Sequence, residues 1–410
     1  MKVDRKRRWK IFLVAGATMA LVAGMASTLP SAYAGGTIKA DDDKYISIGM
    51  GIRSSFNAVE RGASNSDSYS NSFAVNNARI YVNGGIHKYI KFAFNTECFN
   101  CNSNAAAGTQ GTMGLLDAIG QFEINETVNF WVGRTLVPTE RGELNGPFYH
   151  AVFDGFRTPF NPADFSSGFG TGGAGLYGRD NGAVFFGKVH PGGAHLQYVA
   201  SVFTGLQGPI NNGGSLKYAG RLTLNLLNDE SNPGYYTSGT YYGTAGDILA
   251  IAVGVEHQKD GAGSTLNRAD YTGFVSDLLF EKVLSDKGVF TFNAEFKRNQ
   301  AGNLASYTDG TTFPTFGGTS WTAYALYLFP QEIGIGRFQP YGRYTYLDAL
   351  HGNGQREEWE LGTNYVISGH NARISAYGRT GDLNSTFASY TPGATGRKLE
   401  SFHIALQLQY

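Results

Sequence analysis

The chain ends in Ser401-Phe-His-Ile-Ala-Leu-Gln-Leu-Gln-Tyr410, a stretch in which every second side chain is apolar. The apolar positions are Phe402, Ile404, Leu406, Leu408 and Tyr410, and polar or small residues fill the positions between them. A two-residue period is typical of a β-strand with one apolar face and one polar face. The sequence therefore predicts that the chain ends in an amphipathic strand whose last residue is aromatic.

This terminal strand resembles the closing strand of bacterial outer-membrane β-barrels, in which the last aromatic residue is part of the signal read during membrane insertion. The alternative is an ordinary amphipathic edge strand in a soluble sandwich, which has the same periodicity. The rest of the chain favours the barrel.

The first 34 residues have the three parts of a secretory signal peptide. A basic region with six Lys and Arg residues precedes an apolar stretch, 11–26, and Ala32-Tyr33-Ala34 provides a small-residue cleavage site. The Arg7-Arg8 pair lacks the usual continuation of a twin-arginine signal. We therefore expect export by the general secretory route, cleavage after Ala34 and a single mature domain over 35–410.

Removal of the signal makes the chain mildly acidic. The sequence holds 33 basic and 33 acidic residues, of which the signal contains six and one, so the mature chain has 27 against 32, or about −5. This charge excludes nucleic acid as a partner. After the signal, no apolar run approaches the roughly 18 residues of a membrane-spanning helix. Many short alternating segments, rich in Gly, Tyr and Phe, can still cross a membrane as a closed barrel.

Cys98 and Cys101 are the two cysteines of the sequence. In the oxidising compartment that a signal peptide implies, a small disulfide-closed loop is the expected state. Haem attachment would need a histidine where Asn102 stands, and no further Cys or His follows at the spacing of a zinc finger. We expect a disulfide here and neither a metal nor a cofactor.

Alternating segments recur along the mature chain, separated in turn by tight and by long polar connections. They lie at 45–53, 78–83, 90–94, 116–124, 128–135, 179–189, 194–205, 217–227, 247–257, 271–282, 289–298, 321–329, 337–347, 358–367, 372–379 and 401–410. An even number of strands, about sixteen, predicts an all-β fold, a transmembrane antiparallel β-barrel with tight periplasmic turns and long external loops. A barrel of this size encloses an aqueous lumen. The connection between 227 and 247 is long and rich in tyrosine.

Short motifs in these segments follow one another in the order and spacing of a known family. They are Arg79-Ile-Tyr-Val-Asn-Gly84, Ile90-Lys-Phe-Ala-Phe-Asn-Thr-Glu97, Val132-Gly-Arg134, Gly178-Arg-Asp-Asn-Gly-Ala183, Leu196-Gln-Tyr198, Phe203-Thr-Gly205, Tyr327-Leu-Phe-Pro330, Phe338-Gln-Pro-Tyr-Gly-Arg-Tyr344, Leu361-Gly-Thr-Asn-Tyr365 and Gly369-His-Asn-Ala-Arg373. Over nearly the whole mature chain, they resemble the phosphate-selective porin O/P family of Gram-negative outer membranes. The resemblance implies a sixteen-stranded channel, a homotrimer, whose third long loop folds into the pore. It also implies contact with outer-membrane lipid, lipopolysaccharide and small anionic or neutral solutes.

If the apolar face of each strand meets lipid, the alternation indicates which charges face the lumen. The inward basic residues are Arg53, Arg79, Lys91, Arg221, Lys297, Arg343, Arg373 and Arg379, and the inward acids are Asp117, Glu123, Asp277, Glu281 and Glu295. Once the barrel closes, Arg53, Arg79, Lys91, Arg343, Arg373 and Arg379 come from neighbouring strands. We expect a basic wall opposite a more acidic one, which would steer anions along one side. The alternative is that these side chains lie at different heights and only hydrate a wide lumen.

The long stretch 136–177 is the expected constriction loop. It carries Glu140, Arg141, Glu143, Asp154 and Arg157 among aromatic residues such as Phe148 and Phe153. We expect the aromatic residues to attach the loop to the wall and the charges to line the opening. The resemblance implies that phosphate-specific members use several arginines and a lysine in this region. Here the few basic residues are balanced by acids, which favours a mild anion preference over phosphate specificity.

No pattern in the sequence predicts catalysis. Gly168-Phe-Gly-Thr-Gly-Gly173 has the spacing of a dinucleotide fingerprint without the required βαβ unit. The eight histidines lack HExxH spacing and several fall in predicted turns, so solvated loop histidines are expected and not metal ligands. His403 lacks the nucleophile motif that a barrel lipase would need. The sequence predicts a porin for passive diffusion of small hydrophilic solutes and not an enzyme. The alternative is a non-conducting barrel that sheathes an electron carrier, with Cys98 and Cys101 as a redox pair.

Overall fold

The computed structural model describes residues 36–63, 65, 67–99, 101, 111–155, 158, 178–230, 232–263, 265–300, 317–349, 355–383 and 398–410. The expected signal peptide with its cleavage site, Arg157 and the glycine-rich motif at 168–173 lie outside the described residues.

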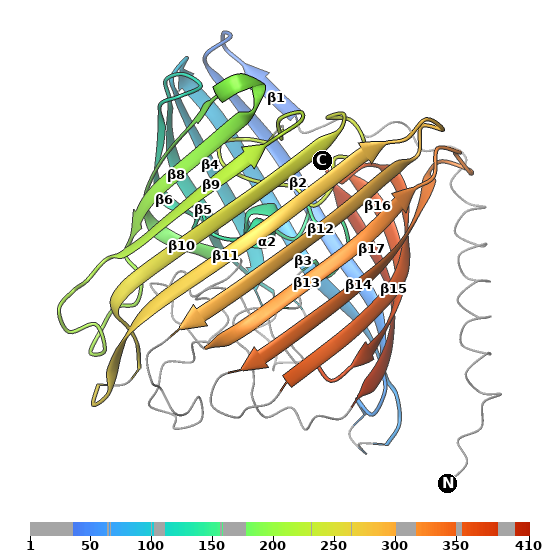
Figure 1. Ribbon diagram of the computed structural model, residues 1–410. Helices are drawn as coiled ribbons and strands as arrows, with labels where there is room; N and C mark the ends of the chain where they lie inside the picture. The colour runs from blue at the N-terminus through green and yellow to red at the C-terminus, as the bar shows by residue number, and fades with distance from the viewer. Residues whose placement is uncertain are drawn as a thin grey trace.

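Sixteen strands in the described part of the chain form a closed antiparallel barrel, as the sequence predicts (Figure 1). They are β2 (Tyr45–Val59), β3 (Ser70–His87), β4 (Ile90–Phe99), β5 (Thr112–Glu123), β6 (Asn129–Leu136), β7 (Arg179–Val189), β8 (His195–Phe203), β9 (Lys217–Asn225), β10 (Ile248–Gly263), β11 (Arg268–Val283), β12 (Val289–Gln300), β13 (Gly318–Leu328), β14 (Arg337–Ala349), β15 (Gln355–Ser368), β16 (Ala372–Gly381) and β17 (Leu399–Gln409). Each pairs with the next, and β17 pairs with β2 from Ser401 opposite Val59 to Gln409 opposite Gly51. The terminal alternating stretch is therefore the strand that closes the barrel.

A further short strand, β1 (Gly36–Lys39), was not predicted. It pairs with the start of β2, with Gly36 opposite Ile48 and Lys39 opposite Tyr45. Because β3 occupies the other edge of β2 along its whole length, β1 lies on the same edge as β17 and continues its line. All four of its residues are exposed, so it lacks the alternation that identified the other strands.

The two faces of the barrel wall differ in chemistry. On β2, the outward residues Ile46, Ile48, Met50 and Ile52 are 43–58% exposed, whereas the inward Arg53 is 2% exposed. An apolar outer face around a polar interior is the pattern of a barrel that is embedded in lipid. Among the described residues, no helix is both long enough and apolar enough to cross a membrane.

The two ends of the barrel differ in their connections. At the end where β1 and the carboxyl terminus lie, which we call the turn end, most connections are tight, including the 3₁₀ turn η3 (Pro191–Gly193) (Figure 1). Near the opposite end, the loop end, Cys98 at the end of β4 forms a disulfide with Cys101. The connection between β9 and β10 departs from this pattern, because it is long although it belongs to the turn end.

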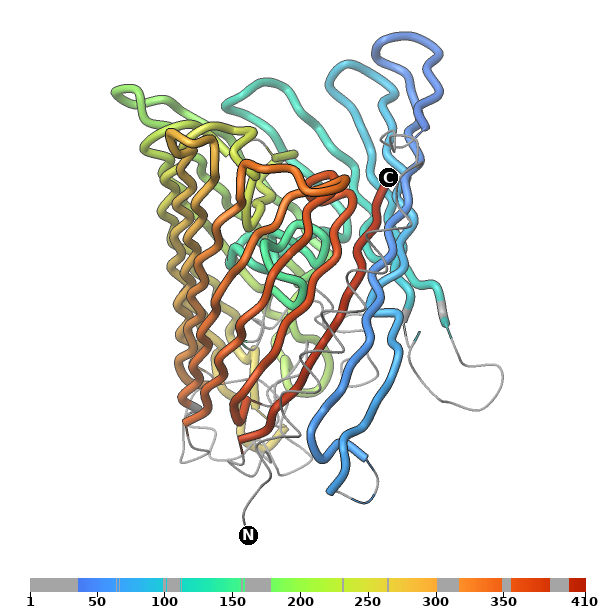
Figure 2. Tube along the Cα trace, turned by 90° about the vertical axis from the view of Figure 1, so that its right-hand side faces the viewer, coloured from blue at the N-terminus to red at the C-terminus, as the bar shows by residue number. Residues whose placement is uncertain are grey.

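Two connections fold into the barrel. The first, which we call the loop segment, comprises 137–155, follows β6 and contains the short helix α2 (Arg141–Asn145), all of whose residues are buried. The second, which we call the turn segment, comprises 226–230 and 232–247 between β9 and β10. Figure 2 shows the loop segment inside the barrel wall, surrounded by strands. The lumen is thus narrowed by chain that enters from both ends.

Candidate functional site in the barrel lumen

The structure brings five residues of the predicted basic wall together. Arg53 on β2, Arg79 on β3, Arg343 on β14, and Arg373 and Arg379 on β16 are each at most 9% exposed and form what we call the arginine cluster. Lys91 on β4 is not part of it. Its ammonium group pairs with Glu123 at 2.6 Å, and both side chains are partly exposed.

Three of these arginines hold the backbone of the loop segment. Arg53 donates to the carbonyl oxygen of Phe153, and Arg343 donates to that of Asp154. Arg373 donates to the carbonyl oxygens of His150 and Ala151 at 2.8 and 3.0 Å. Buried carbonyl groups outside regular structure need donors from elsewhere. These arginines therefore anchor a segment that lacks the regular backbone hydrogen bonds of a strand.

Carboxylates stand among the same arginines, so the surface is mixed in charge. Arg79 pairs with Glu97 at 2.6 Å. Arg343 and Arg379 share Glu360 at 2.5 and 2.6 Å, and Arg379 also pairs with Asp154 at 2.5 Å. Glu97 and Glu360 were not among the acids predicted to face the lumen, although Glu360 alternates with the outward Trp359. The structure thus differs from the expected separation of a basic wall from a more acidic one, because these acids lie among the arginines.

Arg141 connects three parts of the opposite side of the lumen. Its Nε donates to Asp277 on β11 at 2.9 Å, and both Nη atoms donate to Glu230 of the turn segment at 2.8 Å. Arg221 on β9 donates to the same Asp277 at 2.6 and 2.9 Å and to the carbonyl oxygen of Thr139 at 2.7 Å. A bidentate guanidinium–carboxylate contact fixes geometry as well as charge. The loop segment is therefore tied both to the wall and to the turn segment.

The other charges of the loop segment are also buried. Glu140 forms an ion pair with Lys297 on β12, and the backbone NH of Gly142 donates to Glu295 at 3.2 Å. Glu143 is 1% exposed, and burial together with the neighbouring Glu140 raises its pKa well above the usual range. These charges were expected to line an opening. In the structure, most of them instead attach the loop segment to the barrel wall.

Aromatic rings complete the attachment, as expected. The guanidinium group of Arg53 lies 4.0 Å from the ring centre of Phe153, and that of Arg79 lies 5.4 Å from the ring centre of Phe148. Cation–π contacts of this kind strengthen when they are removed from water. The aromatic rings of the loop segment and the arginines of the wall therefore both attach the segment to the barrel.

The turn segment was not recognised from the sequence as part of the lumen. The hydroxyl of Tyr235 donates to the carbonyl oxygen of Leu136 at 2.6 Å, and the backbone NH of Gly239 donates to that of Tyr149 at 2.8 Å. Glu281 on β11 accepts four hydrogen bonds, whose donors are Thr240 Oγ1, Tyr241 N, Gly243 N and Thr291 Oγ1 at 2.7, 3.0, 2.8 and 3.0 Å. The available signal was a run of tyrosines in a connection that should have been short.

His150 is buried and His370 is partly buried, contrary to the expectation of solvated loop histidines, and His403 on β17 is only 6% exposed. His150 is 5% exposed, and burial together with the guanidinium groups of Arg53 and Arg373 holds its pKa well below the ordinary value. Burial and Arg373 likewise lower the pKa of His370 to about 3. Its Nε2 lies 2.9 Å from the carbonyl oxygen of Thr240. Within the described ranges, no group of three or more His, Cys, Asp or Glu has the arrangement of a metal site.

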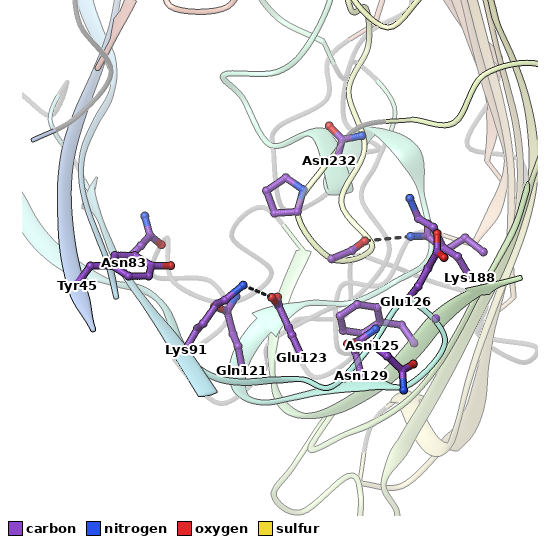
Figure 3. Close-up of a pocket in the computed structure, with 15 residues that line it drawn as sticks. Tyr45, Asn83, Lys91, Gln121, Glu123, Asn125, Glu126, Asn129, Lys188 and Asn232 are labelled. Atoms are coloured by element: carbon purple, nitrogen blue, oxygen red, sulfur yellow. Dashed lines mark hydrogen bonds and ion pairs between the residues drawn. The ribbon is translucent and has the colours of Figure 1, made fainter. Parts of the chain in front are cut away.

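A cavity of about 710 Å³ opens at the turn end, between the inner face of β2 to β8 and residues Asn232 to Gly234 of the turn segment (Figure 3). Six amide side chains line it: Asn83, Gln121, Asn125, Asn129, Gln197 and Asn232. The ion pair of Lys91 and Glu123 lies on its wall (Figure 3). We call this space the turn-end cavity.

Solved structures share this fold. The chain is similar to OmpF of Salmonella typhi, solved in complex with daunomycin, with a TM-score of 0.53 and 12% identity over 92% of this chain and 100% of that one. It is also similar to the outer membrane channel DcaP of Acinetobacter baumannii, with a TM-score of 0.53 and 13% identity over 92% and 100% of the two chains. No family model and no curated protein matches the sequence. Membership of the phosphate-selective porin O/P family therefore stays a prediction.

Proposed function

We propose that this chain is an outer-membrane porin, through which small hydrophilic solutes diffuse passively. The observation that carries the proposal is a closed sixteen-stranded barrel with an apolar outer face and a polar lumen, inside which two chain segments are anchored. Such segments narrow a wide barrel to a selective passage. The signal peptide supports export from a Gram-negative cytoplasm, with cleavage after Ala34.

The finer part of the proposal is a mild preference for anions, with phosphate among them. The arginine cluster supports it, because guanidinium groups favour carboxylate and phosphate oxygens. Glu97, Asp154 and Glu360 neutralise part of that charge. A partly neutralised wall steers ions only weakly, so we expect a small selectivity.

The loop segment is the proposed constriction. Arg141 and Glu140 hold it in place on one side, where Glu143 is also buried, and Asp154 is the acid that pairs with the arginine cluster on the other.

The reversal potential of the refolded protein in a planar bilayer under a salt gradient tests the proposal, with and without phosphate. Arg79→Gln should move the potential toward cation selectivity. The matched variant Glu97→Gln removes the opposite charge, 2.6 Å away, and should move it toward anion selectivity. A cation-side potential for the unaltered protein would refute the anion preference and leave the channel standing. No conductance from a folded, heat-modifiable barrel would refute the porin.

We also propose a homotrimer, which the family resemblance implies. Light scattering of the detergent complex should give the protein mass of three copies, and a mass of one copy would refute this assembly.

A further inference from the structure

We propose that the turn-end cavity binds neutral polyhydroxylated solutes of the mono- and disaccharide class. The inference rests on the proposed function, since it takes the lumen as the route by which such a solute reaches the cavity. The volume of about 710 Å³ lies within the range of about 300–1,000 Å³ found for small-molecule sites. Most of the strand residues that line it, such as Asn83, Gln121 and Asn129, stand at inward positions of the alternation.

Unused hydrogen-bonding capacity is the first argument. The side chains of Asn83, Gln121 and Asn129 form no hydrogen bond with any other described residue. Asn129 is only 7% exposed, so it is an amide held in a nearly buried position without a protein partner. An amide offers both donors and acceptors, and a sugar hydroxyl does the same. A polyol can therefore satisfy several of these groups at once.

Charge is the second argument. Lys91 pairs with Glu123 at 2.6 Å, and Lys188 pairs with Asp229 at 2.5 Å. A third charged group, Glu126, lies 2.8 Å from His190. Lys91 and Lys188 are each matched by a carboxylate within the protein, so they offer an anion entering the cavity no net attraction to offset its lost hydration. A neutral solute carries no such penalty.

Aromatic surface is the third argument. Phe186 and Tyr45 contribute rings to the lining, among the amide side chains. The C–H faces of a sugar ring pack on such surfaces while its hydroxyl groups reach the amides. Phe186 packs edge-on against Trp131, with ring centres 5.2 Å apart.

Trp131 supplies an optical signal for this site. It is 1% exposed and faces the lumen, and a side chain at Gly234 would come within 2.4 Å of its ring. The turn segment therefore lies directly on this indole. Trp321 and Trp359 are 38% and 54% exposed on the outer face, so they supply a constant background.

The test is a fluorescence titration of the refolded mature protein with glucose and sucrose. Polyethylene glycol of similar size serves as the control solute, because it lacks hydroxyl groups along its length. We expect a saturable change that Trp131→Phe abolishes. Gln121→Leu should weaken binding about tenfold, the effect of one lost hydrogen bond. Asn83→Ala, at an exposed position, should weaken it in the same direction without disturbing packing.

Asn212→Leu is the matched control, because Asn212 is an exposed amide in the connection between β8 and β9 at the loop end. It should leave the titration unchanged. No saturable response to either sugar, or an equal response to the glycol, would overturn the inference. So would unaltered binding in both Gln121→Leu and Asn83→Ala. Conductance of the same preparation separates the two proposals, because ion flow without sugar binding refutes only the site, and sugar binding without ion flow refutes only the porin.

Discussion

Replacement of Arg141 by glutamine removes the contact that joins the loop segment to both the barrel wall and the turn segment. The side chain is 1% exposed and donates to Asp277 and, with two nitrogens, to Glu230. Glutamine cannot span both acceptors and carries no charge. Water cannot replace the lost donor without opening the packed interior.

Removing one partner of a buried ion pair costs about 3–5 kcal/mol, because the remaining charge loses its counterion. Asp277 keeps Arg221 through contacts of 2.6 and 2.9 Å, so the loss falls mainly on Glu230. We therefore take the lower value, about 3 kcal/mol, which corresponds to more than a hundredfold shift, at about 1.4 kcal/mol per tenfold change. The shift should favour release of the loop segment while the barrel stays closed.

Hydrogen exchange of 137–155, followed by mass spectrometry, measures that shift. We expect exchange about a hundredfold faster in Arg141→Gln, together with larger current fluctuations in single-channel recordings. The double variant Arg141→Gln/Glu230→Gln should recover part of the protection, since it also removes the orphaned carboxylate. Unchanged exchange in the single variant would refute the reasoning.

Lys398→Gln provides the matched control. Its ammonium group pairs with Glu357 at 2.6 Å, but the two side chains are 64% and 38% exposed. Exposed pairs contribute about 0–1 kcal/mol. If this variant accelerated exchange in the loop segment as much as Arg141→Gln, charge loss in general, and not the buried contact, would be responsible.

Further predictions concern the turn segment, pH and the disulfide. Glu281→Gln should weaken the attachment of the turn segment to the barrel wall by about 1–3 kcal/mol, because one of the two acceptor oxygens becomes a donor. Proteolysis within 236–247 should then be faster than in the unaltered protein, whereas Lys398→Gln should leave it unchanged. An unchanged rate of proteolysis in Glu281→Gln would contradict this prediction. Because the pKa of Glu143 is raised above 4.5, the folded chain binds more protons than the unfolded chain at pH values between the two pKa values, so protection of the loop segment should fall as pH rises through this window. Hydrogen exchange corrected for its intrinsic pH dependence measures this, and a fall of the same size in Glu143→Gln would exclude Glu143 as the cause. Reduction of the Cys98–Cys101 disulfide should lower stability by about 2 kcal/mol at most, since the closed loop is short, and should leave conductance intact; loss of conductance in Cys98→Ser/Cys101→Ser would contradict this.

Strand positions could be predicted because lipid imposes one rule on the outer face. Every strand of the barrel must present apolar residues to the outside, and only an alternating sequence does so. Segments such as 271–282 and 372–379 could therefore be recognised as strands from their own alternating sequence. β1 could not be recognised in this way, since its four residues are all exposed. Its position depends on the part of the β2 edge that β17 leaves unpaired.

The lumen was predicted less well, because no comparable rule governs it. Alternation gives the direction of Arg343 but not its partner. The contacts of Arg343 are with Glu360, on the next strand, and with the carbonyl oxygen of Asp154, in a connection far away in sequence. Neither partner follows from the alternation. The tyrosines of the turn segment are another example, because a polar connection that folds inward resembles one that stays in water.

The seam between the two ends of the chain fixes how the barrel can close. A slip of β17 by two residues along β2 would keep its apolar face outward, so alternation alone does not oppose it. Gln409 pairs with Gly51 and Gly36 pairs with Ile48, and between them Tyr410 exchanges two backbone hydrogen bonds with Met50 at 2.8 and 3.0 Å. A slip toward β1 would bring Tyr410 against Gly36. Residues 36–39 near one end of the chain thus block a slip of the closing strand in that direction.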